Sequence, residues 1–158
     1  LKEAILLERR GNAFYANVAD RTESVPLKHF FTNMADEETR HIEILSEQFR
    51  SFQKHQAFVP NDFGDTDVER AASSVLSKEI QEKISAAGFE AAAISAAMAM
   101  EERAIKLYAE RAAATSNLEE RALYEWLAEW ERSHLRLLEE IDRQLTEKIW
   151  FDNHFWPF

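Results

Sequence analysis

Apolar residues recur at three- and four-residue steps along four long stretches of this chain, which is the period of an amphipathic α-helix. The pattern predicts helices over residues 2–21, 25–54, 89–114 and 118–148. Ser24 and Asn117 stand in the turns as predicted N-caps, and Pro26 lies in the first turn of the second helix. The chain of 158 residues has only three Gly and three Pro, which also favours long helices.

The interval between the second and third helices is much longer than a turn. Residues 55–66 predict a loop, residues 67–87 predict one or two short helices, and Gly88 ends this segment. A connection of this length can cross from one end of a helix bundle to the other. We therefore predict an all-α fold, an antiparallel four-helix bundle over residues 1–148. It consists of two helical hairpins joined by a crossover at about residues 55–88.

The chain closes with an aromatic C-terminal tail, residues 149–158. A large apolar segment is not left in water. We therefore expect the tail to pack on the bundle or on a second subunit, which would suit a homodimer.

Glutamates and histidines interrupt the apolar faces in a pattern that occurs twice. Glu38 is followed three residues later by His41, and 93 residues further on the pattern returns as Glu131 and His134. The same offset relates two more pairs, which are Glu8 with Glu101 and Tyr15 with Tyr108. The two hairpins are therefore an internal repeat, and each carries one Glu, one Tyr and one Glu-x-x-His in the same order.

The repeat predicts a metal site. Residues three apart share one face of a helix, so each Glu-x-x-His pair points into an apolar stripe. Four carboxylates buried without cations are costly, no Lys or Arg lies on these stripes at that level, and two divalent ions would balance the charge. Hydrogen-bonded Glu–His pairs without metal are the alternative, which two copies in register disfavour. Carboxylates with imidazoles suit Fe, Mn or Zn, and redox chemistry favours Fe or Mn.

Charge and composition exclude several classes of function. The formal net charge of −10 disfavours nucleic acid and anionic membrane surfaces as partners. The absence of Cys excludes disulfides, thiolate metal sites and cysteine catalysis within this sequence. Because there is neither a signal peptide nor an apolar run of 18 residues, we expect a cytoplasmic location.

The repeated motif resembles that of the ferritin-like di-iron carboxylate superfamily, and the chain looks most like its rubrerythrin-like branch. The resemblance implies two iron ions with Glu38 and Glu131 as bridging ligands. It places Glu8 and His41 at one ion, and Glu101 and His134 at the other. It further implies Tyr15 and Tyr108 as candidate catalytic residues that hydrogen-bond to the carboxylates.

The chain departs from rubrerythrin in two respects. With no Cys it has no rubredoxin-like domain for electron delivery. Rubrerythrin also has an extra Glu near the site on the third helix, whereas the positions three before and after Glu101 are Met98 and Ala104. We therefore expect a symmetric site of four Glu and two His that depends on an external electron donor.

These features together predict an oxidoreductase-type di-iron protein that reacts with O2 or H2O2, as a ferroxidase or in peroxide removal under oxidative stress. A non-catalytic iron-binding or iron-delivery module and a structural metallo-bundle holding Zn or Mn remain the alternatives. Tyr124, Trp126 and Trp130 are predicted to be packing residues, with electron transfer as a second interpretation. Five further carboxylates predict a solvated face or a path for incoming iron: Glu37, Glu43, Glu47, Glu139 and Glu140.

Overall fold

The computed structural model describes residues 1–60, 63 and 88–152, and all regular structure in this part of the chain is helical. The helices are α1 (Lys2–Arg21), α2 (Val25–His55), α5 (Phe89–Ala114) and α6 (Leu118–Asp152). The predicted all-α fold is confirmed for these residues. The predicted short helices within 67–87 lie outside the described residues, as does the tail from residue 153 onward.

Local signals explain where the helices begin and end. Asn117 caps α6, since its side-chain Oδ1 accepts a hydrogen bond of 2.9 Å from the backbone N–H of Glu120. Ser24 is the N-cap residue of α2 but makes no side-chain capping bond, and Pro26 occupies the first turn. Helix α6 continues to Asp152, four residues beyond the predicted end at Lys148.

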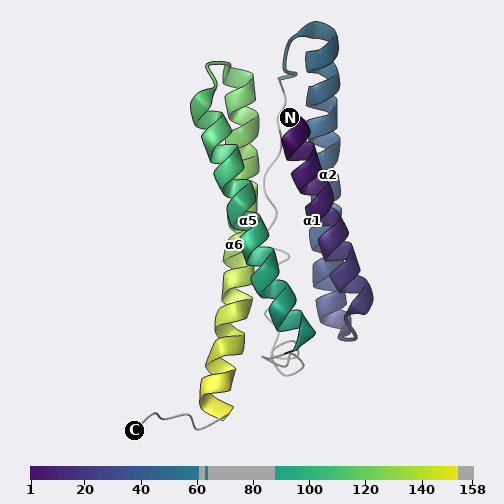
Figure 1. Ribbon diagram of the computed structural model, residues 1–158, viewed down its shortest axis with the longest axis vertical. Coiled ribbons are helices and arrows are strands. Elements are labelled where there is room, and N and C mark those ends of the chain that lie inside the picture. Colours follow the sequence, from purple (N-terminus) through teal and green to yellow (C-terminus); the bar gives the residue numbers. More distant parts are fainter. Residues whose placement is uncertain (61–62, 64–87, 153–158) are drawn as a thin grey trace.

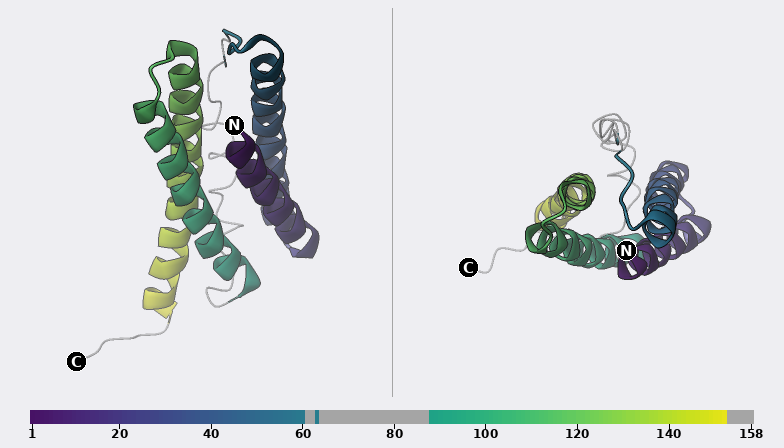
Figure 2. Two further views of the ribbon diagram at one scale, coloured as in Figure 1. Left: turned by 45° about the horizontal axis from the view of Figure 1, so that its top comes forward. Right: turned by 90° about the horizontal axis from the view of Figure 1, so that it is seen from above.

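The four helices form two antiparallel hairpins, α1 with α2 and α5 with α6 (Figure 1). Helix α2 ends at one end of the bundle and α5 begins at the other, as the predicted crossover requires. Seen along the bundle, the two hairpins contact each other through α1 and α5, which lie side by side (Figure 2). Helix α2 packs on α1, and α6 packs on α5. In the described residues no helix is long and apolar enough to cross a bilayer.

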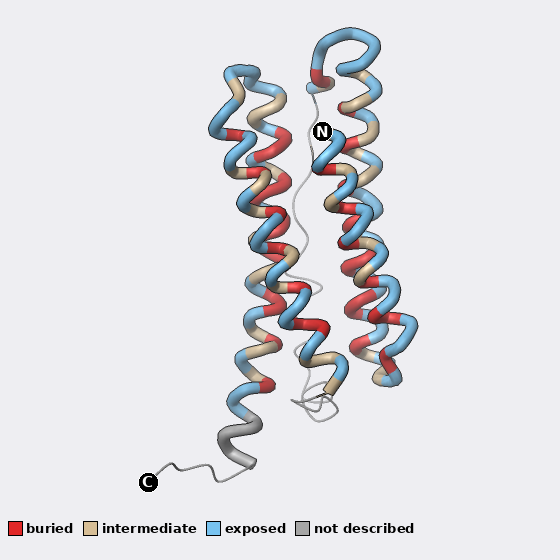
Figure 3. Tube along the Cα trace, in the orientation of Figure 1, coloured by how far each residue is buried: buried red, intermediate tan, exposed pale blue. Residues whose placement is uncertain are grey.

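Buried residues follow the inward side of each helix (Figure 3). They form two apolar clusters, one around Tyr15, Phe31 and Leu138 and the other around Leu45, Tyr108 and Leu127. Phe52 continues the apolar period of α2 but is 38% exposed, whereas the polar residue Gln48 is buried. Gln48 is satisfied there because its side-chain amide both donates to and accepts from the backbone of Val59, at 3.0 and 2.9 Å.

Candidate metal centre

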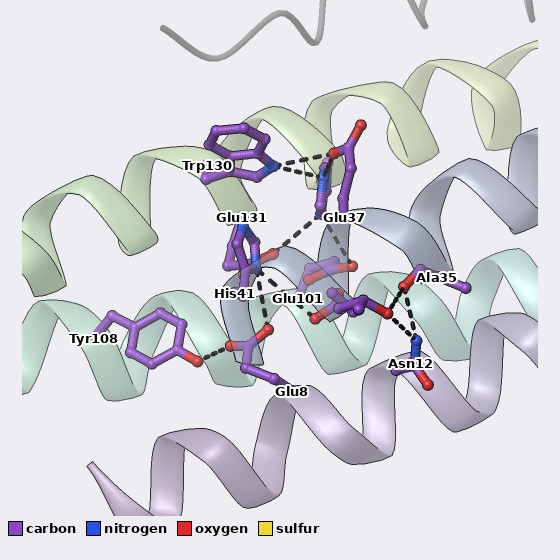
Figure 4. A network of polar contacts seen from close by, with 12 residues as sticks. Glu8, Asn12, Ala35, Glu37, His41, Glu101, Tyr108, Trp130 and Glu131 are labelled. Atoms are coloured by element: carbon purple, nitrogen blue, oxygen red, sulfur yellow. Dashed lines mark hydrogen bonds and ion pairs between the residues drawn. The ribbon is translucent and has the colours of Figure 1, made fainter. Parts of the chain in front are cut away.

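A polar layer crosses the bundle between the two apolar clusters, and it contains all six predicted ligands. Figure 4 labels four of them, Glu8, His41, Glu101 and Glu131. None of the six residues is more than 3% exposed. Their ligand atoms form two overlapping groups in which all atoms lie within 4.8 Å of one another. The first group is Glu8, Glu38, His41 and Glu131, and the second is Glu38, Glu101, Glu131 and His134. Glu38 and Glu131 belong to both.

The three-residue spacing within each Glu-x-x-His pair places both side chains on the inward face of its helix. Nδ1 of His41 lies 3.1 Å from a carboxylate oxygen of Glu8 and 3.0 Å from one of Glu131. Nδ1 of His134 lies 3.1 Å from the other Glu131 oxygen and 3.8 Å from Glu101. Nδ1 of His41 therefore faces carboxylates from α1 and α6, and Nδ1 of His134 faces Glu131 of its own helix and Glu101 of α5.

Each of the two predicted tyrosines hydrogen-bonds to a carboxylate on the other helix of the pair α1 and α5. The hydroxyl of Tyr15 on α1 donates a hydrogen bond to Glu101 on α5, and the hydroxyl of Tyr108 on α5 donates one to Glu8 on α1. Both phenol rings are fully buried. The predicted hydrogen bonds from Tyr15 and Tyr108 are therefore present in the structure.

Burial and mutual repulsion disfavour ionisation of three of the four carboxyl groups. Burial, reinforced by the charge of Glu131, raises the pKa of Glu8 and Glu38 well above the usual range. The same two causes raise the pKa of Glu101 to about 7. Without metal ions, these carboxyl groups therefore retain protons at pH values where exposed glutamates are ionised.

Glu131 carries the negative charge that the histidines neutralise. Burial opposes its ionisation, but the charge of His41 and the close approach of both imidazoles outweigh burial and hold its pKa well below the usual range. Burial likewise opposes the charged form of the imidazoles, but the neighbouring carboxylates raise the pKa of His41 and His134. Among the described residues, no Lys or Arg forms an ion pair with the four carboxylates.

Several buried polar atoms at the centre make no hydrogen bond. Both carboxylate oxygens of Glu131 and Nδ1 of His134 lack a hydrogen-bond partner within the described part of the chain, although they lie at ion-pair distance from one another. Such atoms are rare in protein interiors unless another group satisfies them. Carboxylate and imidazole atoms converging in this way fit a pair of divalent cations.

The comparison with known protein families supports this assignment. The model of the rubrerythrin family matches residues 1–142, which covers α1, α2, α5, most of α6 and all six predicted ligands. The chain belongs to the rubrerythrin family. Comparison with curated proteins and with solved structures gave no match. The predicted resemblance to rubrerythrin is thereby confirmed, and the buried Glu and His cluster lies inside the matched segment.

In this rubrerythrin-family chain, Gly11 allows the carboxylate of Glu38 to approach α1 closely. A Cβ atom at Gly11 would lie 3.1 Å from the carboxyl carbon of Glu38 and 3.3 Å from both of its oxygens. The corresponding residue in the second copy is Ala104, so the two halves differ here. The absence of a side chain at residue 11 therefore leaves room for the Glu38 carboxylate at the centre of the site.

One prediction at the site is wrong. Glu37 was expected on a solvated face, but its side chain is only 26% exposed and one of its oxygens lies 2.5 Å from Nε2 of His134. The indole N–H of Trp130 donates to the same carboxylate at 3.0 Å. The hydrogen bonds hold the pKa of Glu37 below its usual value, although burial opposes this. Trp130 itself is buried, as predicted for a packing residue.

The sequence contained one usable signal for this contact. At the offset of the repeat, Glu37 corresponds to Trp130, so the position before the Glu of each Glu-x-x-His pair is acidic in one copy and aromatic in the other. The four Glu and two His keep the symmetry of the repeat, but the surroundings of His134 differ from those of His41. The metal-site assignment itself rests on the six residues that the repeat selects.

Proposed function

We propose that this protein holds two iron ions between its four helices and reacts with O2 or H2O2, as a ferroxidase or as a peroxide-reducing oxidoreductase with an external reductant. The observation that carries the proposal is the membership of Glu38 and Glu131 in both four-residue groups. Because Glu38 and Glu131 belong to both groups, these two carboxylates would be able to bridge two neighbouring ions.

The two ligand groups suggest a role for each residue. Glu38 and Glu131 would bridge the ions, Glu8 and His41 would complete one position, and Glu101 and His134 the other. Two ferrous ions would balance the charge of the four carboxylates, which would release the protons that they retain without metal. When bound, the iron supplies electrons and Lewis acidity, whereas the protein fixes the ligand geometry.

The tyrosines fix the carboxylates at the ends of the site. Tyr108 donates to Oε1 of Glu8, whose Oε2 faces Nδ1 of His41. Tyr15 donates to Oε1 of Glu101, the oxygen that also lies 3.8 Å from Nδ1 of His134. These bonds limit the rotation of both carboxylates. Among the described residues no tyrosine donates to Glu38 or Glu131, which would leave these two carboxylates to adapt to the ions.

A small cavity of about 20 Å³ adjoins the four carboxylates between α1 and α5. Its remaining walls are Leu7, Gly11, Met100 and Ala104. A volume of this order accommodates about one water-sized molecule, which is comparable in size to O2 or H2O2. We infer that the oxidant approaches the carboxylates from this side, because the histidines do not line the cavity.

Stopped-flow absorbance spectroscopy tests the function. Protein loaded anaerobically with Fe²⁺ is expected to show an absorbance change on mixing with O2 or with H2O2, and to repeat it when an external reductant is supplied. A change that occurs once and cannot be repeated with reductant would favour an iron-delivery module. Absence of any oxidant-dependent change would refute the proposed reaction.

Substitution Gly11→Ala is expected to weaken metal binding while leaving the fold intact. Alanine raises helix propensity by about 1 kcal/mol over glycine, but its Cβ would crowd the Glu38 carboxylate at 3.1 Å. We therefore expect lower Mn²⁺ affinity in isothermal titration calorimetry together with unchanged helix content in circular dichroism. Unchanged affinity would show that Glu38 has room to move and that the close approach is not required.

Substitution Tyr108→Phe removes the donor to Glu8, and Tyr15→Phe removes the donor to Glu101. Each buried carboxyl group then loses a partner, so each variant is expected to lose about 1–3 kcal/mol of unfolding free energy without metal. Urea denaturation of the two variants provides the measurement. Since the two bonds are related by the repeat, each variant is the control for the other, and a loss in only one would contradict their equivalence.

A further inference from the structure

The environments of the two histidines differ, although the repeat relates them. His134 presents Nε2 to the carboxylate of Glu37 at 2.5 Å. Nε2 of His41 is buried and has no hydrogen-bond partner among the described residues. Instead, the His41 ring lies edge-on to two indole rings, at centroid distances of 5.7 Å to Trp126 and 5.3 Å to Trp130.

Glu37 determines which nitrogen of His134 carries the proton. A carboxylate accepts hydrogen bonds, so Nε2 of His134 must donate to it. The indole N–H of Trp130 lies 3.0 Å from both Glu37 and Nε2 of His134, and as a donor it can be satisfied only by the carboxylate. When the proton on Nδ1 leaves, the proton on Nε2 stays hydrogen-bonded to Glu37, and His134 has a lone pair on Nδ1, the atom that faces Glu101 and Glu131.

His41 has no comparable partner. Its Nδ1 also faces carboxylates, those of Glu8 and Glu131. If Nδ1 binds a metal ion, the remaining ring proton must lie on Nε2, where no described group accepts it. A buried donor without an acceptor is unfavourable. Metal binding through His41 therefore leaves a buried N–H without an acceptor, and this free-energy cost does not arise at His134.

We propose that Glu37 is a positioning residue that makes the two metal positions unequal, so that the ion at His134 and Glu101 is bound more tightly than the ion at His41 and Glu8. The inference rests on the proposed two-metal function. A carboxylate that accepts the second ring N–H of a metal-ligating histidine typically changes metal affinity by about 10- to 100-fold. The site therefore fills in order, with the His134 position first.

Variants that each disable one position test the order. His41→Ala leaves the His134 position, and His134→Ala leaves the His41 position. In anaerobic Co²⁺ titrations followed by absorbance, His41→Ala is expected to bind its ion about 10- to 100-fold more tightly than His134→Ala. Equal affinities in the two variants would overturn the inference.

The role of Glu37 is tested by adding Glu37→Ala to each of these variants. The substitution is expected to weaken Co²⁺ binding by about 10- to 100-fold in the His41→Ala background, and to have no effect in the His134→Ala background. Equal effects in both backgrounds would show that Glu37 acts only through its negative charge. This result would overturn its role as a positioning residue.

Two further variants separate hydrogen bonding from charge and protect the test against misfolding. Glu37→Gln keeps an oxygen that accepts from His134, so it should retain more Co²⁺ affinity than Glu37→Ala. Asp36→Asn removes the same charge from the preceding, exposed residue and should change nothing. If Asp36→Asn weakened binding as much as Glu37→Gln, the inference would fail. If the unsubstituted protein bound fewer than two Co²⁺ ions, the proposed function would fail instead.

Discussion

Replacement of Glu38 and Glu131 together by alanine is expected to reduce the number of tightly bound divalent ions from two to none. These two residues are the only members common to both ligand groups of the described chain, so their loss leaves each position with one carboxylate and one imidazole. The expected effect is larger than that of any other pair. Equilibrium dialysis against Mn²⁺, followed by metal analysis, measures it directly.

Single substitutions make the same prediction more specific. Glu38→Ala alone should weaken both positions, whereas Glu8→Ala should weaken only the position that contains His41. Glu43→Ala is the matched control, since it removes an exposed carboxylate from the same helix as Glu38. A double variant that still bound two ions would refute the assignment of the bridging residues.

The metal-free protein is expected to lose stability as the pH rises from about 5 to 8, and metal ions are expected to reverse this trend. Burial raises the pKa of Glu8 and Glu38, and that of Glu101 to about 7, and neighbouring carboxylates raise the pKa of both histidines. Over this interval the folded state therefore holds more protons than the unfolded state. Stability then falls as the pH rises through the folded-state pKa values.

The lowered pKa values act in a different range. The stability that Glu131 and Glu37 contribute is present above the usual pKa of glutamate and is lost as the pH falls below it. Maximum stability without metal is therefore expected near pH 5. With metal, the ligands must be deprotonated, so binding tightens and adds more stability as the pH rises.

Thermal melts between pH 5 and 8, with EDTA and with excess Mn²⁺, measure both trends. For Glu101 alone, a rise of its pKa to about 7 corresponds to about 3 kcal/mol. That is a fall in Tm of roughly 6–12 °C in a protein of this size. Glu101→Gln is the control, because it should remove that part of the pH dependence. A metal-free Tm that rose over the interval would contradict the electrostatic account.

The sequence predicted the helices because their burial follows the helical period closely. The four helices begin where the apolar pattern begins, and they end within a few residues of the predicted positions. The six clustered residues were predictable for a different reason. A pair such as Glu38 and His41 is ambiguous alone, but its return as Glu131 and His134 at one offset connects positions on four helices.

The contacts that break the repeat could not be predicted in this way. Glu37 on α2 reaches His134 on α6, and the sequence spacing does not encode how closely these two helices approach. Phe52 fits the apolar stripe of α2, yet it is partly exposed because the core shifts to Gln48 near the end of the helix. The helical period of the sequence thus predicted the four helices and the six residues at the centre of the site. The asymmetry around the centre depends on tertiary packing.

The most direct test of the central claim is anomalous X-ray diffraction from crystals of the protein grown with Fe²⁺ or Mn²⁺. We expect two adjacent anomalous peaks inside the bundle, with Glu38 and Glu131 bound to both ions. Glu8 and His41 should lie at one peak, and Glu101 and His134 at the other. A single peak, or peaks bound by other residues while these six remain hydrogen-bonded to one another, would contradict it.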